Sequence, residues 1–125
     1  MDSKELGTRG LTSLTDCVSE SMSAAQAAEA MRSCWERAER HLAPIMGRAG
    51  LGIMFRRGEH VAARNLAVHS PPGTDRSIAT LCEWVGSLPQ PEAVTVSKAF
   101  LASVEAYLVS LLGLEGTRRM LSRPQ

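Results

Sequence analysis

Apolar residues recur every three or four positions along most of this 125-residue chain, which is the spacing of one face of an α-helix. The first such pattern is carried by Leu11, Leu14, Val18 and Met22. Directly after it, Ser23 and Gln26 have the spacing of a capping box, in which each side chain satisfies a backbone amide of the other residue. The sequence therefore predicts a short helix over 11–22 and a second helix that begins at Ser23.

The second helix is predicted to be amphipathic. Its apolar stripe consists of Met31, Trp35, Ala38, Leu42 and Ile45. On the other face, Arg32, Glu36 and Arg40 alternate in charge at i,i+4 spacing, which favours a solvated surface. Because Pro44 has no amide hydrogen and disfavours helical geometry in the residue before it, we expect the helix to kink or restart near 41–44.

Helical spacing resumes over 47–68, where the glycines make the helix dependent on tertiary packing. Two prolines and a glycine within 70–73 end this segment, because they supply neither donors nor helical dihedral angles. A short third helix, capped by Thr74 or Asp75, is then expected to end at Gly86.

The stretch 92–112 is the most apolar in the chain and is predicted to be the central helix, with a last helical piece over 114–121. Residues 1–10 are polar and are predicted to form a flexible tail. The remaining residues, 11–125, are predicted to form one all-α domain, a bundle of four to five helices.

Two segments of the chain repeat one pattern. Each has an apolar helix end, a glycine, two residues and a second glycine, followed by a basic and apolar helix start; the glycines are Gly47 and Gly50 in one copy and Gly113 and Gly116 in the other. One interpretation is a pair of helix–hinge–helix units related by pseudo-symmetry. The alternative is that any glycine that ends a helix before another begins gives this pattern.

The composition restricts the classes of partner. With 44% hydrophobic and 22% charged residues and a net charge of +1, the chain is typical of a globular protein and has no overall field that would attract nucleic acid. The three cysteines, Cys17, Cys34 and Cys82, are widely spaced and contain no CxxC pair, which argues against a disulfide framework or a structural zinc site. No secretory signal and no uninterrupted apolar run of membrane-spanning length are found, so a cytoplasmic location is expected.

Patterns that carry catalytic chemistry are not found, so we predict no enzyme activity, catalytic residue, cofactor or metal. The three histidines lack the glutamate at i−3 that di-iron bundles use, and no serine lies in a nucleophile elbow. His60 is the candidate for a phosphotransfer or ligand-sensing histidine, although Ala63 stands where phosphotransfer modules usually carry a lysine.

Basic residues are concentrated between Gly47 and Ser70, where the arginines outnumber the single Glu59. They are Arg48, Arg56, Arg57 and Arg64. These arginines indicate a contact for an anion, a nucleotide or nucleic acid; alternatively, they serve helix ends and cover apolar stripes with their aliphatic stems.

The segments LAPIMGRAGLGIMFRRGEH and LLGLEGTRRML resemble a group of small, poorly characterised helical proteins of proteobacteria and their relatives. The resemblance covers Trp35 to His60 and Leu108 to Leu121. It implies an all-helical domain that accompanies signalling systems, and it implies no defined activity.

The sequence as a whole favours a non-catalytic regulatory or adaptor module that acts through another protein in bacterial signalling, with a homodimer as one form of the interaction. The short isolated helix over 11–22 needs a surface on which to bury its stripe, so it is the predicted docking element. The candidate interaction residues are Leu11, Leu14, Val18, Met22, Arg48, Arg56, Arg57, His60 and Arg64. The alternatives are an arginine-dependent nucleotide or nucleic-acid binding protein and a histidine phosphotransfer or ligand-sensing module; nucleic acid and membrane are not the expected partners.

Overall fold

The computed structural model describes residues 13–64 and 77–122, and within these residues all regular secondary structure is helical. A 3-10 turn, η1 (Leu14–Cys17), is followed by α2 (Ala24–Arg64), α3 (Ile78–Gly86) and α4 (Gln90–Ser122). The all-α class is therefore confirmed. The described part of the chain contains three α-helices, so the expected count of four to five is not confirmed.

Two of the helices are sharply kinked at a glycine, and each therefore has two arms. The dihedral angles are φ 72° and ψ 174° at Gly47 in α2, and φ 78° and ψ 167° at Gly113 in α4. This region of backbone conformation is open essentially to glycine alone. We call 24–46 and 90–112 the long arms, and 48–64 and 114–122 the return arms. The two glycines predicted to be hinges are thus confirmed as hinges of the same geometry.

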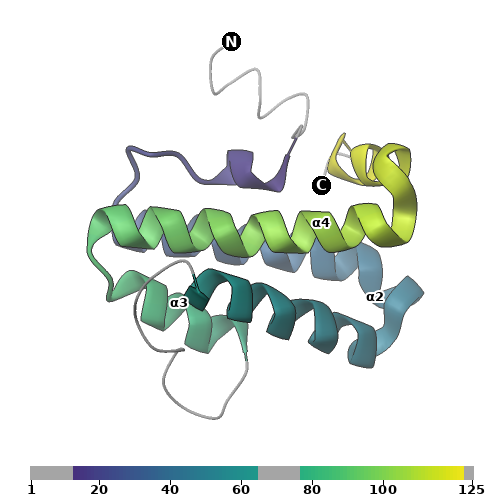
Figure 1. Ribbon diagram of the computed structural model, residues 1–125, viewed down its shortest axis with the longest axis horizontal. Coiled ribbons are helices and arrows are strands. Elements are labelled where there is room, and N and C mark those ends of the chain that lie inside the picture. The colour runs from purple at the N-terminus through teal and green to yellow at the C-terminus, as the bar shows by residue number, and fades with distance from the viewer. Residues whose placement is uncertain (1–12, 65–76, 123–125) are drawn as a thin grey trace.

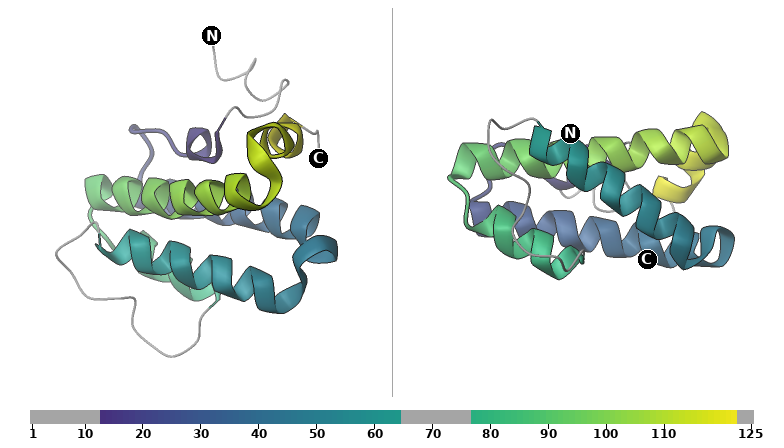
Figure 2. Two further views of the ribbon diagram at one scale, coloured as in Figure 1. Left: turned by 45° about the vertical axis from the view of Figure 1, so that its right-hand side comes forward. Right: turned by 60° about the horizontal axis from the view of Figure 1, so that its bottom comes forward.

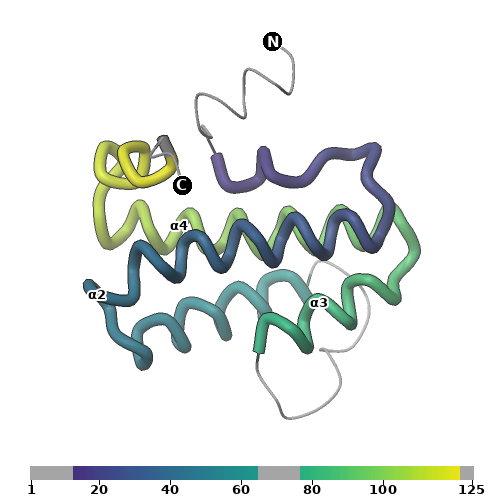
Figure 3. The backbone as a smooth tube through the Cα atoms, turned by 180° about the vertical axis from the view of Figure 1, so that it is seen from behind, coloured from purple at the N-terminus to yellow at the C-terminus, as the bar shows by residue number. Residues whose placement is uncertain are grey.

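The arms form three layers (Figures 1 and 3). The two long arms lie side by side in the middle layer and run in the same direction, with both hinges at one end of the molecule. The return arm of α4 and the segment before α2 lie on one side of this layer; the return arm of α2 and α3 lie on the other. Figure 2 shows the return arm 48–64 lying obliquely across the long arms. α4 packs against α2, α3 and η1, and α2 packs against α3 and η1 as well, so the two helices share the central position.

Burial repeats along α2 and α4 with a single offset of 66 positions, the separation of the two hinge glycines. Every buried residue of α2 up to Phe55 has a buried counterpart in α4 at this offset. The pairs are Ala27 and Ala93, Ala28 and Val94, Met31 and Ser97, Cys34 and Phe100, Trp35 and Leu101, Ala38 and Val104, Leu42 and Leu108, Leu51 and Thr117, Met54 and Met120, and Phe55 and Leu121. The repeated pattern of the sequence therefore extends over both arms, which supports the interpretation of two related units.

The start of α2 agrees with the prediction and its break does not. The Ser23 amide donates to Gln26 Oε1 at 2.9 Å, and the Gln26 amide donates to Ser23 Oγ at 3.1 Å, which confirms the capping box. The kink expected near 41–44 lies at Gly47 instead, and the helix runs through Pro44. Proline removes one hydrogen bond but its φ suits a helix, whereas the reversal of direction needs a positive φ.

The predicted helix over 11–22 is wrong within the described residues, since only the four residues of η1 are helical. We call 13–22 the N-terminal strap. Its first turn is hydrogen-bonded to α4, because Ser13 Oγ and the Leu14 amide both donate to Glu105 Oε1, at 2.8 Å and 2.6 Å. Its last turn is held by Lys98 Nζ, which lies 2.7 Å from Glu20 Oε1.

The ends of the other helices also refine the predictions. α3 ends at Gly86 as expected, but its N-cap is Ser77, whose hydroxyl accepts from the Thr80 amide at 3.2 Å. Thr74, Asp75, the last residues of the predicted 47–68 helix and the predicted tail over 1–10 lie outside the described residues. Leu111, near the end of the stretch 92–112 that is predicted to be the central helix, is 51% exposed beside the Gly113 hinge.

Within the part of the chain that the structure describes, α4 is the one helix long and apolar enough to cross a membrane, with a mean hydropathy of 1.4 over 18 residues. This segment is interrupted by Lys98 and Glu105, so it is not an uninterrupted apolar run. Core helices of soluble proteins meet the same criterion when most of the helix is buried, whereas 22% of this window is buried in the described structure. A cytoplasmic location stays a prediction.

Candidate functional site

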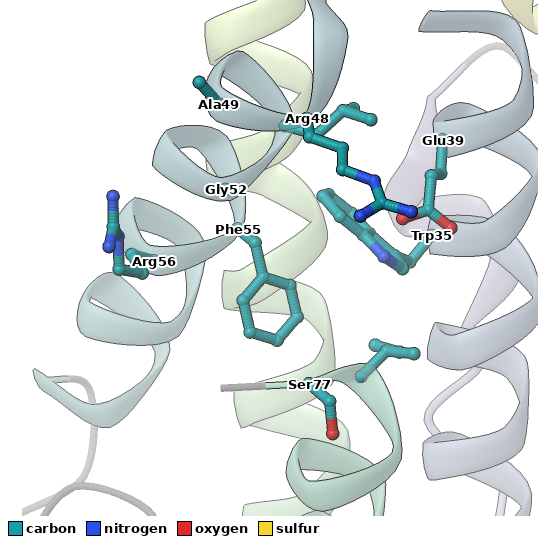
Figure 4. Close-up of a pocket in the computed structure, with 10 residues that line it drawn as sticks. Trp35, Glu39, Arg48, Ala49, Gly52, Phe55, Arg56 and Ser77 are labelled. Carbon is teal, nitrogen blue, oxygen red and sulfur yellow. The ribbon is translucent and has the colours of Figure 1, made fainter. Parts of the chain in front are cut away.

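An open pocket of about 840 Å³ lies between the long arm of α2, the return arm of α2 and the start of α3. Figure 4 shows the side chains that line it. They are Trp35, Glu39, Arg48, Ala49, Leu51, Gly52, Phe55, Arg56, Ser77 and Ile78. The Gly47 hinge creates this pocket, because it turns the return arm back over the long arm that carries Trp35 and Glu39.

The floor of the pocket is aromatic. Trp35 and Phe55 are 3% and 5% exposed, and their ring centroids are 5.2 Å apart in an edge-to-face arrangement. Phe100 of α4 completes the cluster, 5.8 Å from Trp35 and 5.5 Å from Phe55. Edge-to-face packing of this kind stabilises each ring beyond its area of burial. The floor is therefore a fixed part of the core that presents apolar edges to the pocket.

The rim of the pocket is charged. Figure 4 shows the guanidinium group of Arg48 pointing toward Glu39 and the indole of Trp35, while Arg56 stands further along the return arm. Both arginines are exposed, and neither forms an ion pair with another residue in 13–64 or 77–122. Two guanidinium groups and one carboxylate leave the rim with a net positive charge.

Helix termini reinforce this charge. Ser77 and Ile78 stand at the N-terminal end of α3, and Arg48 and Ala49 begin the return arm of α2. The N-terminal end of a helix carries a partial positive charge from its aligned peptide dipoles. The pocket therefore combines an apolar floor with a rim that suits an anionic group.

The equivalent glutamate in the other half of the molecule is hydrogen-bonded. The counterpart of Glu39 at the offset of 66 is Glu105, whose carboxylate accepts the hydrogen bonds from Ser13 and Leu14 of the strap. Glu105 thus binds the strap, whereas Glu39 borders an open pocket.

The structure divides the predicted arginine cluster between two surfaces. Arg48 and Arg56 line the pocket, whereas Arg57 lies on another side of the return arm, beside a groove of about 570 Å³ that also contains Tyr107 of α4. Arg64 is exposed at the end of α2 and lines neither. His60 is exposed on α2, so nothing described here covers it.

The apolar residues that were predicted to dock on a partner pack against the core of the protein itself. Leu14 and Val18 are each 2% exposed and belong to the hydrophobic core, and Met22 packs partly against that core. The expectation that Leu14 and Val18 present a surface to a partner is therefore corrected. Leu11 lies outside the described residues.

Sequence reasoning did not identify Trp35, Phe55 and Glu39 as residues of one site. Trp35 was predicted on the apolar stripe of the second helix, and the rings of both aromatic residues lie in the core. Glu39 had no distinguishing pattern. A signal was present in the repeat: Glu39 and Glu105 are the acidic pair at the offset defined by the hinge glycines. Extending the repeat beyond the glycines would have singled them out.

Among the described residues, no group of three or more His, Cys, Asp or Glu side chains could hold a metal ion.

Comparisons of the chain with protein-family models, with curated proteins and with solved structures found no match. The resemblance to small helical signalling-associated proteins stays a prediction.

Proposed function

We propose that this chain is a non-catalytic regulatory or adaptor module that binds an acidic segment of a partner protein in the pocket beside the Gly47 hinge. The observation that supports this most is the pairing of a buried aromatic floor, Trp35 and Phe55, with two exposed arginines at the rim. An apolar side chain of the partner would contact the floor while a neighbouring carboxylate meets Arg48 or Arg56. We place this activity in the cytoplasm and in bacterial signalling, as the sequence predicts.

The shape of the site favours a peptide over a small molecule. The pocket is open along the return arm, so a bound chain could continue past it on both sides, whereas small-molecule sites enclose most of the ligand surface. Guanidinium groups bind carboxylates through two parallel hydrogen bonds, which adds geometric selectivity for acidic side chains. The central floor and polar rim match the usual anatomy of a protein interface.

The proposal is tested by affinity capture from a lysate of the native organism with the immobilised chain. The Arg48→Gln and Arg56→Gln double variant removes both positive charges of the rim and keeps a polar side chain at each position, so the aromatic floor is unchanged. Arg118→Gln is the matched control, because Arg118 is an exposed arginine on the return arm of α4. We expect a protein that the wild-type chain and the control retain and the double variant loses, with retention that falls as salt is raised.

The second candidate function, arginine-dependent binding of nucleic acid, is distinguished in the same experiment. Its support is the exposed set Arg48, Arg56, Arg57 and Arg64 on one arm. Binding of nucleic acid would be abolished by nuclease and would depend on Arg57 and Arg64 as strongly as on the rim. Equal retention by the double variant and the wild type would contradict the pocket proposal.

Self-association is a further part of the proposal, and the hinge end of the molecule supports it. Ile45 and Leu111, which occupy equivalent positions before the two hinges, are 68% and 51% exposed, and Leu114 is 56% exposed. Large exposed apolar side chains at one end of a protein are typical of an interaction surface. Light scattering of the wild type and of an Ile45→Ser and Leu111→Ser variant tests this; the homodimer is expected in the first and lost in the second.

A further inference from the structure

Two cysteines that are far apart in the sequence meet where the N-terminal strap crosses α2. The sulfur atoms of Cys17, in η1, and Cys34, in the long arm of α2, are 2.7 Å apart. A disulfide bond has a sulfur–sulfur distance of about 2.05 Å, so the two thiols need little movement to become bonded. Both cysteines are free thiols in the structure.

The two thiols differ in access. Cys17 is half-buried at the edge of the strap, whereas Cys34 is 3% exposed and also approaches the Leu14 carbonyl oxygen, with the sulfur 3.8 Å from it. The strap is therefore held against α2 at its middle by the thiol pair, and at its start by the hydrogen bonds to Glu105. A reagent from solvent reaches Cys17 first.

The electrostatic environment also makes Cys17 the more reactive of the two thiols. The hydrogen bond between Cys17 and Cys34 lowers the pKa of the Cys17 thiol, burial opposes this, and the nearby positive charge of Arg37 lowers it further. The same hydrogen bond, together with burial, raises the pKa of the Cys34 thiol. Since the thiolate is the reactive form, Cys17 is the nucleophile of the pair.

We propose that Cys17 and Cys34 form a peroxide-sensitive modification site, in which oxidation by a hydroperoxide joins the N-terminal strap covalently to α2. The Cys17 thiolate attacks one oxygen of hydrogen peroxide; the O–O bond breaks and hydroxide leaves, giving a sulfenic acid at Cys17. Cys34 then attacks the Cys17 sulfur; the S–O bond breaks, the S–S bond forms, and the leaving hydroxide takes the Cys34 proton as water. The two thiols together lose two electrons, and the peroxide is reduced to two molecules of water.

The third cysteine provides an internal control. Cys82 lies in α3, where its thiol donates to the Ala28 carbonyl oxygen at 3.3 Å and no other cysteine is its partner. Burial raises the pKa of the Cys82 thiol to about 11, which keeps it in the less reactive protonated form at neutral pH. Peroxide is therefore expected to oxidise the Cys17 and Cys34 pair and to leave Cys82 free.

The experiment uses the full chain. The reduced protein is treated with one molar equivalent of hydrogen peroxide, quenched with catalase, unfolded, alkylated with iodoacetamide and digested with trypsin without reductant. Arg32 lies between Cys17 and Cys34, so trypsin places the three cysteines in separate peptides. We expect one disulfide-linked pair of peptides, containing Cys17 and Cys34, and a single alkylated cysteine, Cys82. Reduction should restore all three alkylated cysteines.

Two comparisons make the result decisive. The Cys82→Ser variant should form the same disulfide at the same rate, whereas wild-type protein unfolded in urea should form it more slowly, because the fold supplies the proximity. The oxidised wild-type chain should also melt several degrees higher than the reduced chain, since the bond closes a loop. Three alkylated cysteines after peroxide, a linkage through Cys82, or equal rates in the folded and unfolded protein would overturn the proposal.

Discussion

The α2 half and the α4 half of this protein share one hinge geometry and one burial pattern, yet their equivalent glutamates have different surroundings. Both hinges have a positive φ at glycine, 72° at Gly47 and 78° at Gly113. In the α4 half, the carboxylate of Glu105 accepts two hydrogen bonds from the start of the N-terminal strap. Beside the first hinge, Glu39 borders a pocket of about 840 Å³.

The repeat therefore sets the backbone, while the side chains placed on it differ between the halves. In the α4 half, Leu101 and Leu114 occupy the positions of Trp35 and Arg48, so the aromatic ring and the guanidinium group of these two residues have no counterparts there. The same backbone geometry carries a packing contact with the strap in one half and a candidate binding site in the other.

The largest expected effect is at the aromatic floor. Trp35→Ala removes the ring that contacts both Phe55 and Phe100, and should lower the free energy of unfolding by about 3–5 kcal/mol. Trp84→Phe, on the half-buried face of α3, is the control and should cost far less. Urea denaturation followed by circular dichroism measures both. Equal losses in the two variants would contradict a structural role for the floor.

The hinges should respond equally to substitution. Alanine at Gly47 or at Gly113 would have to adopt a positive φ, so each change should cost about 1–3 kcal/mol. Gly52→Ala is the matched control, because a Cβ there meets nothing within 4 Å and its φ is helical. That variant should be stabilised by up to about 1 kcal/mol. A hinge variant as stable as the Gly52 variant would show that the two hinges are not equivalent.

Particular residues show which parts of the fold and of the site could be predicted from the sequence. The capping box at Ser23 and the hinge glycines are local features, so their chemistry is visible in a few adjacent letters. The break near Pro44 was misplaced by three residues, because a proline signals a lost hydrogen bond but the change of direction needs a positive φ. The contacts of the strap with Glu105 and Cys34 join residues 91 and 17 positions apart, and no local pattern encodes them.

The two equivalent glutamates should differ strongly. Glu105→Gln weakens two charge-assisted hydrogen bonds to the strap and should cost about 1–2 kcal/mol. Glu39→Gln changes an exposed carboxylate at the open pocket and should stay within about 0.5 kcal/mol of the wild type. Thermal and urea denaturation of both variants tests this. A larger loss of stability for the Glu39 variant than for the Glu105 variant would contradict the structural role of Glu105.

The smallest expected effect concerns the thiol of α3. Burial raises the pKa of Cys82 from 9.0 to about 11. Below the lower value the thiol is neutral in both states, so it contributes no pH dependence. Between the two values the unfolded chain loses its proton first, and stability falls as pH rises. Urea melts at about pH 8 and about pH 10 should show a smaller decrease for Cys82→Ser than for the wild type; an identical decrease would contradict this.

The central claim, that an acidic peptide binds beside Gly47 and not beside the strap-bound Glu105, is tested most directly by nuclear magnetic resonance. The probe is a short N-acetylated peptide in which one leucine is flanked by glutamates, added to the ¹⁵N-labelled full chain. We predict shifted amide resonances over 48–56 and at Ser77 and Ile78, with little change at Ser13, Leu14 and 114–122. Shifts of equal size in both halves, or shifts confined to the return arm of α4, would contradict the account.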